Sequence, residues 1–384
     1  MLIANIIGLS ILSIFLIFIL HKKNKLMSDY MLILTIVLIS IIFISYLWVQ
    51  YGLNSVNFIL EKLVSFYILP AFLMYSMLLI SEDNKIKKEW WWFSSFAIAF
   101  SIFIFIDFTF LTDYDTEKLR EQYRTPSYIY QFFYRGGNVF VLFALLWFLK
   151  KLKQYHKKIK DNYSFIEAIK LTWLKNFTWI YLINNCFILI ISLAFSFLHL
   201  GSLKALYLVV FLSIVLSLFY LCYHGIRQYS LTEFNNSIGL NSNVITETKK
   251  TSQNVVIGNN DKYKSSSLSV EEMESIFKKI KHLFEVEEIY LEPQLKIHDL
   301  ALKLEVLSHY ISQTINSMGQ QSFYDFVNSY RVNHFKRLLS NSENNKYTIL
   351  ALGIESGFNS KATLNRIFKQ NTGVSPKDFQ KNAV

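Results

Sequence analysis

The sequence predicts an all-α protein that joins a seven-helix transmembrane bundle to a cytoplasmic domain with two helix-turn-helix units. Composition is the first observation: of 384 residues, 52% are hydrophobic and 17% aromatic, which is too apolar for an ordinary soluble protein. The second is a series of long apolar runs in residues 1–227, and the third is a set of short amphipathic segments in residues 269–384. The formal net charge of +11 suits basic cytoplasmic loops and nucleic-acid binders equally, so it does not separate them.

Seven apolar runs make up the predicted membrane domain, residues 1–227. Each has about 20 residues, the length that a helix needs to cross roughly 30 Å of hydrocarbon. Helices of soluble proteins rarely stay apolar on every face for so long, which disfavours the alternative of buried soluble helices. The first run is predicted to be a retained anchor, because the basic cluster follows it and no cleavage site is evident. The runs are 2–20, 30–50, 58–80, 90–111, 128–149, 174–198 and 204–224.

The loops between these runs differ in charge, and membrane proteins concentrate Lys and Arg in their cytoplasmic loops. The first, third and fifth loops are rich in lysine, the second has no basic residue, and the fourth mixes basic with acidic residues. The N-terminus is therefore predicted to lie outside and the C-terminal domain in the cytoplasm. The lysines are Lys22, Lys23, Lys25, Lys85, Lys87, Lys88, Lys150, Lys151, Lys153, Lys157, Lys158 and Lys160.

Polar side chains inside the predicted spans are costly in lipid and are therefore candidates for function. Five of them, predicted near the outer side of the membrane, form a candidate ligand pocket in which Asp107 pairs with Arg135. The alternative is that these groups only lock helices together or extend to the interface. Asn184 and Asn185 lie near the middle of the sixth run. The five pocket residues are Glu61, Asp107, Tyr130, Tyr134 and Arg135.

Residues 228–268 are rich in Asn, Ser, Thr and Lys and show no sustained apolar period, so they are predicted to form a flexible linker. A random coil of about 40 residues reaches roughly 35 Å, and it offers a protease an exposed site. The two cysteines, Cys186 and Cys222, both fall in apolar runs and are predicted to be small buried hydrophobes.

The first predicted helix-turn-helix unit spans about 296–317 and follows a helix that begins after Ser269. Its first helix places apolar residues on one face from Ile297 to Leu304, and its turn covers 305–307. Its second helix begins near Ser308, with Ile311, Ile315 and Met318 facing inward. The polar residues left on the outer face can bond base edges or phosphates. They are His309, Ser312, Gln313 and Asn316.

The second predicted unit spans about 347–370 and follows a long helix over 322–340. Ser356, Gly357 and Phe358 form its turn, in which Gly357 allows a positive φ and Phe358 fills the core. Asn359 or Ser360 caps the next helix, whose residues 364, 367 and 368 recur at inward-facing positions. The residues left to contact DNA are Ser360, Lys361, Thr363, Asn365, Arg366 and Lys369.

Residues 269–384 resemble the DNA-binding domain of the AraC/XylS family of bacterial transcription regulators. The resemblance is carried by HYISQTIN (309–316), FYDFVNSYRVNHFKRLL (323–339) and LALGIESGFNSKATLNRIFKQNTGVSP (350–376). It implies an AraC-type fold whose two helix-turn-helix units each place their second helix in the major groove. Seven spans ahead of such a domain resemble the membrane-tethered branch of the family.

Two residues depart from the family pattern. Leu307 stands where a Ser or Asn helix cap is common, and Gly353 stands where Ala is usual, at a cost of up to about 1 kcal/mol in helix propensity. Charge also differs along the domain: acids outnumber bases nine to five over 271–305, and bases outnumber acids nine to three over 331–381. The second unit and the helix before it are therefore predicted to supply most of the attraction for phosphates.

These features predict a sequence-specific DNA-binding transcription regulator in the bacterial inner membrane that couples an unknown extracytoplasmic or membrane signal to promoter binding. The alternatives are a receptor or transporter whose C-terminal domain binds a protein partner, and a latent factor released by proteolysis. No P-loop, kinase motif, metal cluster or catalytic triad is evident, so we predict no enzyme, no metal and no cofactor. The expected partners are double-stranded DNA and membrane lipid; further candidates are RNA polymerase, a second copy of the chain and an unknown small molecule.

Overall fold

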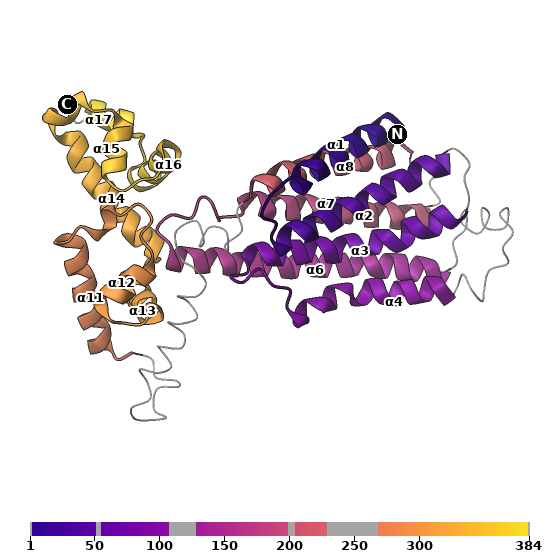
Figure 1. Cartoon of the computed structure of the whole chain (residues 1–384), viewed down its shortest axis with the longest axis horizontal. Helices are drawn as coiled ribbons and strands as arrows, with labels where there is room; N and C mark the ends of the chain where they lie inside the picture. The colour runs from indigo at the N-terminus through magenta and orange to yellow at the C-terminus, as the bar shows by residue number, and fades with distance from the viewer. Residues whose placement is uncertain (1, 51–54, 107–127, 199–203, 229–267, 383–384) are drawn as a thin grey trace. The chain divides into compact units, whose positions relative to one another are not determined.

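The computed structural model describes residues 2–50, 55–106, 128–198, 204–228 and 268–382, which form two compact units (Figure 1). Unit 1 consists of Met1–Lys153 and Leu171–Asn241, and unit 2 consists of Gln154–Lys170 and Ser242–Val384. The described residues form helices and connecting segments, with an isolated β-bridge between Tyr163 and Lys296 inside unit 2. The prediction of an all-α protein is confirmed for this part of the chain.

Unit 1 has a helix over each of the seven predicted apolar runs. The helices lie lengthwise beside one another, with α1 against α2 and α8, α2 against α3, and α7 against α8 (Figure 1). The short helix η1 (Lys88–Trp91) leads into α4. The long helices are α1 (Leu2–Leu20), α2 (Met27–Gln50), α3 (Ser55–Ile80), α4 (Trp92–Ile106), α6 (Tyr128–Asn162), α7 (Thr172–Leu198) and α8 (Lys204–Arg227).

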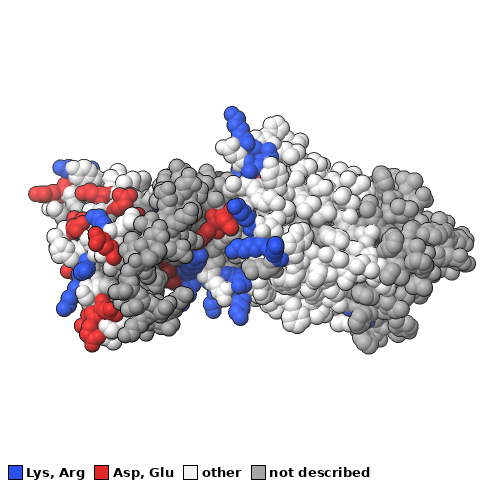
Figure 2. All heavy atoms as spheres, turned by 60° about the horizontal axis from the view of Figure 1, so that its bottom comes forward, with Lys and Arg blue, Asp and Glu red and all other residues white. Residues whose placement is uncertain are grey.

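Three of these helices are long and apolar enough to cross a membrane within the described residues, where the sequence predicts seven spans. They cover Met27–Ser45, Leu63–Ile80 and Thr172–Ile191, and three shorter apolar stretches lie in α1, α4 and α8. Part of the fourth predicted run, beyond residue 106, lies outside the described residues. In Figure 2 the half of the view that holds unit 1 is nearly free of charged side chains, apart from Lys and Arg gathered at one end.

Helix α6 continues to Asn162, although the lysine-rich stretch after residue 149 was predicted to be a loop. The prediction was wrong because the apolar residues of this stretch recur with the spacing of an amphipathic helix. Leu152, Tyr155 and Ile159 are all buried and recur at helical spacing, while the lysines between them keep their charges on the other face. The residues of α6 thus belong to both units, with 154–162 in unit 2.

Unit 2 contains the helices expected of two helix-turn-helix units joined by a long helix. Ser269 caps the first helix with a capping box to Glu272, as predicted. The short helices η3 (Ile289–Leu291) and η4 (Ser342–Lys346) connect the longer ones. The longer ones are α11 (Val270–Glu285), α12 (Ile297–Leu304), α13 (Ser308–Met318), α14 (Phe323–Ser340), α15 (Ile349–Glu355), α16 (Lys361–Thr372) and α17 (Pro376–Asn382).

Helix α14 contributes to the cores of both helix-turn-helix units. Near its beginning, Phe326 packs with Phe284 of α11 at a ring-centroid distance of 4.9 Å. Near its end, Phe335 packs edge-to-face on Phe368 of α16 at 5.4 Å and on Phe358 at 6.4 Å. All five rings are buried, so the positions of the two recognition helices depend on one shared helix.

Candidate nucleic-acid interface

Helix α13, the second helix of the first helix-turn-helix unit, begins without a side-chain cap. Leu307 occupies the N-cap position and offers no hydrogen-bond acceptor there, as its identity predicts. Ile311 and Ile315 are fully buried as expected, whereas Met318 is 37% exposed rather than facing inward. Of the predicted DNA-contacting residues, His309 and Asn316 are exposed, and Ser312 and Gln313 are half-buried.

The turn of the second helix-turn-helix unit is fixed by backbone geometry. Gly357 has a φ of +85°, and a Cβ placed on it would lie 2.8 Å from the carbonyl oxygen of Tyr290. Phe358 is buried directly after it, as predicted. Glycine therefore serves two needs at this position, a left-handed conformation and close approach to the backbone of η3.

Helix α16, the recognition helix of the second helix-turn-helix unit, begins at a capped N-terminus. Ser360 is the N-cap, and its hydroxyl accepts the backbone N–H of Thr363 at 3.2 Å. Thr363 is only 5% exposed and lies beside the core residues of α16, whereas the sequence placed it on the outer face. Lys361, Asn365 and Lys369 are exposed, as expected for an outer face.

Gly353 allows α15 and α16 to pack closely. A Cβ at this position would lie 2.5 Å from Cδ2 of Leu364, a core residue of α16. An alanine would therefore require the leucine side chain to move. The loss of helix propensity expected from glycine is accompanied here by a closer contact between the two helices.

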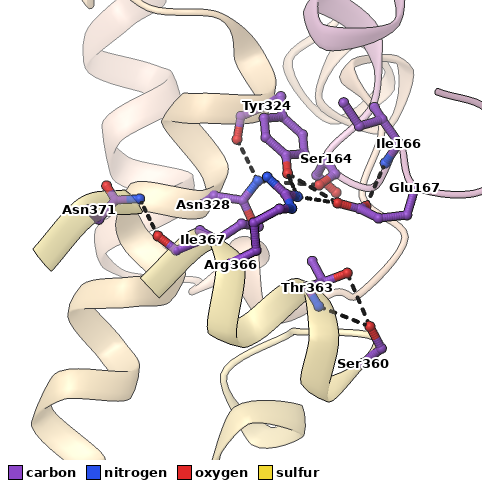
Figure 3. Close-up of polar contacts among 10 residues, drawn as sticks. All are labelled: Ser164, Ile166, Glu167, Tyr324, Asn328, Ser360, Thr363, Arg366, Ile367 and Asn371. Atoms are coloured by element: carbon purple, nitrogen blue, oxygen red, sulfur yellow. Dashed lines mark hydrogen bonds and ion pairs between the residues drawn. The ribbon is translucent and has the colours of Figure 1, made fainter. Parts of the chain in front are cut away.

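Arg366 projects from α16 and has two partners inside unit 2 (Figure 3). Its guanidinium donates to the carboxylate of Glu167 and, at 2.7 Å, to the hydroxyl oxygen of Tyr324 on α14. The side chain of Arg366 is 42% exposed and that of Glu167 is 27% exposed. The residue that the sequence predicts to grip a base is therefore held by a carboxylate in this conformation.

Glu167 belongs to Gln154–Lys170, the segment of unit 2 that includes the end of α6. The anchor of this segment is Ser164, which is 2% exposed. Its N–H donates to the carbonyl of Leu295 at 3.1 Å, and its hydroxyl accepts from Arg331 at 3.3 Å. Its carbonyl accepts from Nδ2 of Asn328 at 3.5 Å. Sequence reasoning treated this segment only as part of a charged loop.

Arg331 is buried in unit 2, although its charge was counted among the bases that attract phosphates. Its Nε donates to the carbonyl of Tyr290 at 2.7 Å, and Nη2 donates to the carbonyl of Glu292 at 2.6 Å. Burial lowers the pKa of Arg331 to about 10, which still leaves it charged at neutral pH. Its charge therefore stabilises the domain internally instead of facing DNA.

The local environment also fixes protons around Arg366. Burial, and then the neighbouring Glu167 carboxylate, raise the pKa of Tyr324 to about 12, so its hydroxyl keeps its proton. Partial burial acts to lower the pKa of Arg366, but the hydrogen bonds and charges of Tyr324 and Glu167 raise it overall. At neutral pH Arg366 therefore carries a full positive charge where it contacts Glu167.

Little of the predicted outer ligand pocket falls within the described residues. Asp107 lies outside them, and only the backbone is described for Glu61, Tyr130 and Tyr134. Arg135 is half-buried on α6. The expected pairing of Asp107 with Arg135 is thus outside the described part of the chain.

A cavity of about 320 Å³ lies inside unit 1 among α2, α3, α4, α6, α7 and α8. Its lining is mainly apolar, and Asn138, Asn184 and Asn185 are among its polar residues. Nδ2 of Asn185 donates to Oδ1 of Asn138 at 3.1 Å, while the buried Oδ1 of Asn185 has no hydrogen-bond partner among the described residues. Such a cavity has the size and character of a small-molecule site.

The geometry of unit 2 defines a class of protein, a helix-turn-helix DNA-binding protein. The family model described as a helix-turn-helix domain matches residues 300–382. This match supports a DNA-binding transcription regulator of the AraC/XylS type. Among the described residues, no group of three or more His, Cys, Asp or Glu is placed to hold a metal ion.

Comparisons with whole proteins add one structure. A solved structure described as a protein of unknown function from Listeria innocua is 24% identical, covers 28% of this chain and 95% of its own, and has a TM-score of 0.25. None of the curated proteins compared matches the chain.

Proposed function

We propose that this protein is a membrane-bound transcription regulator that binds specific double-stranded DNA and couples that binding to a signal received by its N-terminal unit. The observation that carries the proposal is the pair of helix-turn-helix units on α14, of which the second presents Lys361, Asn365, Arg366 and Lys369 from one helix. Arg reads the O6 and N7 atoms of guanine, Asn reads adenine, and Lys neutralises phosphates.

Membrane attachment in the proposal rests on the apolar helices of unit 1. The proposed topology has seven spans in the bacterial inner membrane, with the N-terminus outside and unit 2 in the cytoplasm. Lysines in the first and third connections and in the last turns of α6 support this orientation, because basic segments next to the spans stay inside. The proposed signal site is the cavity of unit 1, where Asn185 Oδ1 has no hydrogen-bond partner among the described residues and would accept a hydrogen bond from a mostly apolar ligand.

The experiment that tests the function is genome-wide binding of the intact, tagged chain. We expect enrichment at a small set of promoters, with a shared sequence that spans two neighbouring major-groove faces. The matched control is the same chain carrying Lys361→Ala, Asn365→Ala and Lys369→Ala, which leave the buried face of α16 untouched. Equal profiles for the two proteins, or an absence of promoter enrichment, would contradict DNA recognition and favour a C-terminal domain that binds a protein partner.

Immunoblots of membrane and soluble fractions test the attachment separately. We expect the intact chain in the membrane fraction whether or not its target promoters are active. A soluble C-terminal fragment that accumulates when those promoters become active would instead support release by proteolysis.

A further inference from the structure

The contacts of residues 154–170 fall on the surface that the proposed function assigns to DNA. Glu167 accepts a hydrogen bond from Arg366 of α16. A second carboxylate of the segment, Asp161, lies near α13: burial raises its pKa, and the neighbouring side chain of Asn316 acts to lower it. The segment therefore places Glu167 against a predicted DNA-contacting residue of α16, and Asp161 beside one of α13.

We propose that residues 154–170 are an intramolecular ligand of the recognition helices that competes with DNA, with Glu167 occupying the guanidinium of Arg366. The inference rests on the proposed DNA-binding function and specifies how that function is controlled. A carboxylate offers an Arg guanidinium two acceptor oxygens, as do the O6 and N7 atoms of guanine and the oxygens of a phosphate. Arg366 cannot satisfy both partners with the same N–H groups.

The segment docks on unit 2 through several hydrogen bonds around Ser164, in addition to the charged contact of Glu167. We call this docking site the seat. Ser164 is buried, and its N–H, hydroxyl and carbonyl are each hydrogen-bonded to residues that follow the linker, namely Leu295, Arg331 and Asn328. The bridge between Tyr163 and Lys296 adds backbone pairing. These bonds set the position of the three residues up to Glu167 and so direct its carboxylate to Arg366.

Charges on both sides of the seat are complementary. Lys160 lies 3.4 Å from the carboxylate of Asp325, and its ammonium group is 5.5 Å from the centre of the Tyr324 ring. Tyr324 in turn donates its hydroxyl proton toward Glu167 at 3.4 Å. Lys160 thus meets an opposite charge at the start of α14, and Glu167 meets one on α16; Figure 3 shows the Glu167 contact.

Helix α6 provides a covalent route for release. It includes Gly137 and Asn138 in the lining of the unit 1 cavity and ends at Asn162, two residues before Ser164. A ligand-dependent shift or rotation of α6 would move the chain that enters the seat. Release of the segment would leave Arg366 available for DNA, so the signal would act by shifting the population of the docked state.

The size of the effect follows from competition. If the segment is docked most of the time, the apparent association constant for DNA is the intrinsic constant multiplied by the fraction of molecules in which the segment is released. Removing the Glu167 carboxylate weakens docking without changing any residue of α13 or α16. We therefore expect Glu167→Ala to bind DNA about five-fold more tightly than the unchanged chain.

The experiment uses the full chain in lipid nanodiscs and a duplex enriched from a randomised double-stranded library by the Glu167→Ala protein. Fluorescence anisotropy measures the Kd of this duplex for three proteins: the unchanged chain, Glu167→Ala and Glu287→Ala. Glu287→Ala is the matched control, because Glu287 is also an acid of unit 2 but lies outside residues 154–170. Its carboxylate pairs with Lys303 at 2.7 Å. Its removal deletes the same charge and so reports any general gain in attraction for phosphates.

A tighter Kd for Glu167→Ala alone supports the proposal. Equal Kd values for Glu167→Ala and Glu287→Ala would overturn it while leaving DNA recognition intact. Failure of the library to enrich any sequence would overturn the proposed DNA-binding function together with this inference.

Hydrogen exchange provides a second readout that needs no substitution. The Ser164 amide donates to Leu295 and should be protected in the DNA-free protein. We expect the enriched duplex, but not a scrambled duplex, to increase the exchange of this amide. Unchanged protection at saturating DNA would show that the segment and DNA bind together, which would overturn competition.

Discussion

The guanidinium of Arg331 donates to the backbone carbonyl of Tyr290 at 2.7 Å, the same carbonyl that Gly357 approaches from the second helix-turn-helix unit. Three elements thus meet at one oxygen: α14, the connection before α12, and the turn before α16. Because Arg331 also donates to Glu292, it fixes the segment that leads into the first unit. This cluster sets the relative placement of the two recognition helices within unit 2.

Replacement of Arg331 by Met should destabilise unit 2. The substitution keeps much of the side-chain volume but leaves the carbonyls of Tyr290 and Glu292 without a buried donor, at a cost of about 2–4 kcal/mol. Native-state hydrogen exchange of α14 amides in the full chain measures this loss. Arg337→Met is the control, since Arg337 lies on the same helix with its side chain 69% exposed and should change stability by no more than about 0.5 kcal/mol. Similar losses in the two variants would contradict the structural role of Arg331.

Gly357→Ala should be more damaging than Gly373→Ala, although both glycines have a φ near +80°. A Cβ at Gly357 would lie 2.8 Å from the Tyr290 carbonyl and 2.9 Å from that of Leu291, whereas a Cβ at Gly373 meets nothing within 4 Å. We expect roughly 1 kcal/mol for the backbone strain at Gly373 and several kcal/mol at Gly357. Thermal unfolding of unit 2 within the full chain compares them. Equal shifts in Tm would show that backbone strain, and not the contact, determines the cost.

The helices of unit 2 could be predicted from the sequence because their apolar residues repeat with a clear helical period. Leu364, Ile367 and Phe368 are buried on α16 as that period requires. Thr363 was misplaced because polarity suggested an outer position, while its hydroxyl accepts a hydrogen bond from Ser360 at 3.1 Å and is satisfied inside. Local pattern assigns a residue to a helix, but the burial of a small polar residue depends on which neighbour satisfies it.

The Glu167 contact could not be predicted in this way. Glu167 and Arg366 are 199 positions apart, and the stretch before Glu167 was expected to be only a charged loop. Its helical part could have been noticed from Leu152, Tyr155 and Ile159, whose spacing continues the apolar face of α6 beyond the predicted span. The seat for Ser164, in contrast, is built from backbone and side-chain groups that leave no periodic signal.

Arg366→Ala should weaken binding to the enriched duplex by roughly 1–3 kcal/mol and relax the preference at one base pair. The measurement is best made in the Glu167→Ala background, because the segment is already weakened there and its release does not offset the loss. Arg337→Ala in the same background is the control, as it removes an exposed charge from α14 rather than from α16. Unchanged affinity and footprint for Arg366→Ala would remove this residue from the proposed interface.

His334 should make the stability of unit 2 fall in mildly acidic solution. Its Nδ1 lies 3.2 Å from the hydroxyl of Ser356, which donates its own proton to the carbonyl of Leu352 and can therefore only accept from the histidine. Burial, and then the charge of Arg337, lower the pKa of His334 below its ordinary value of 6.5, against the weaker opposite effects of Glu288 and Glu355.

Between that lowered pKa and 6.5 the unfolded chain binds the proton more strongly, so the free energy of unfolding decreases as pH falls, by up to about 1.4 kcal/mol per pH unit. His334→Gln can keep a donor toward Ser356 and cannot titrate, so the difference in unfolding free energy between it and the unchanged chain should vary with pH below 6.5 and be constant above it. Parallel stability curves for the two proteins across that range would rule out a contribution from His334.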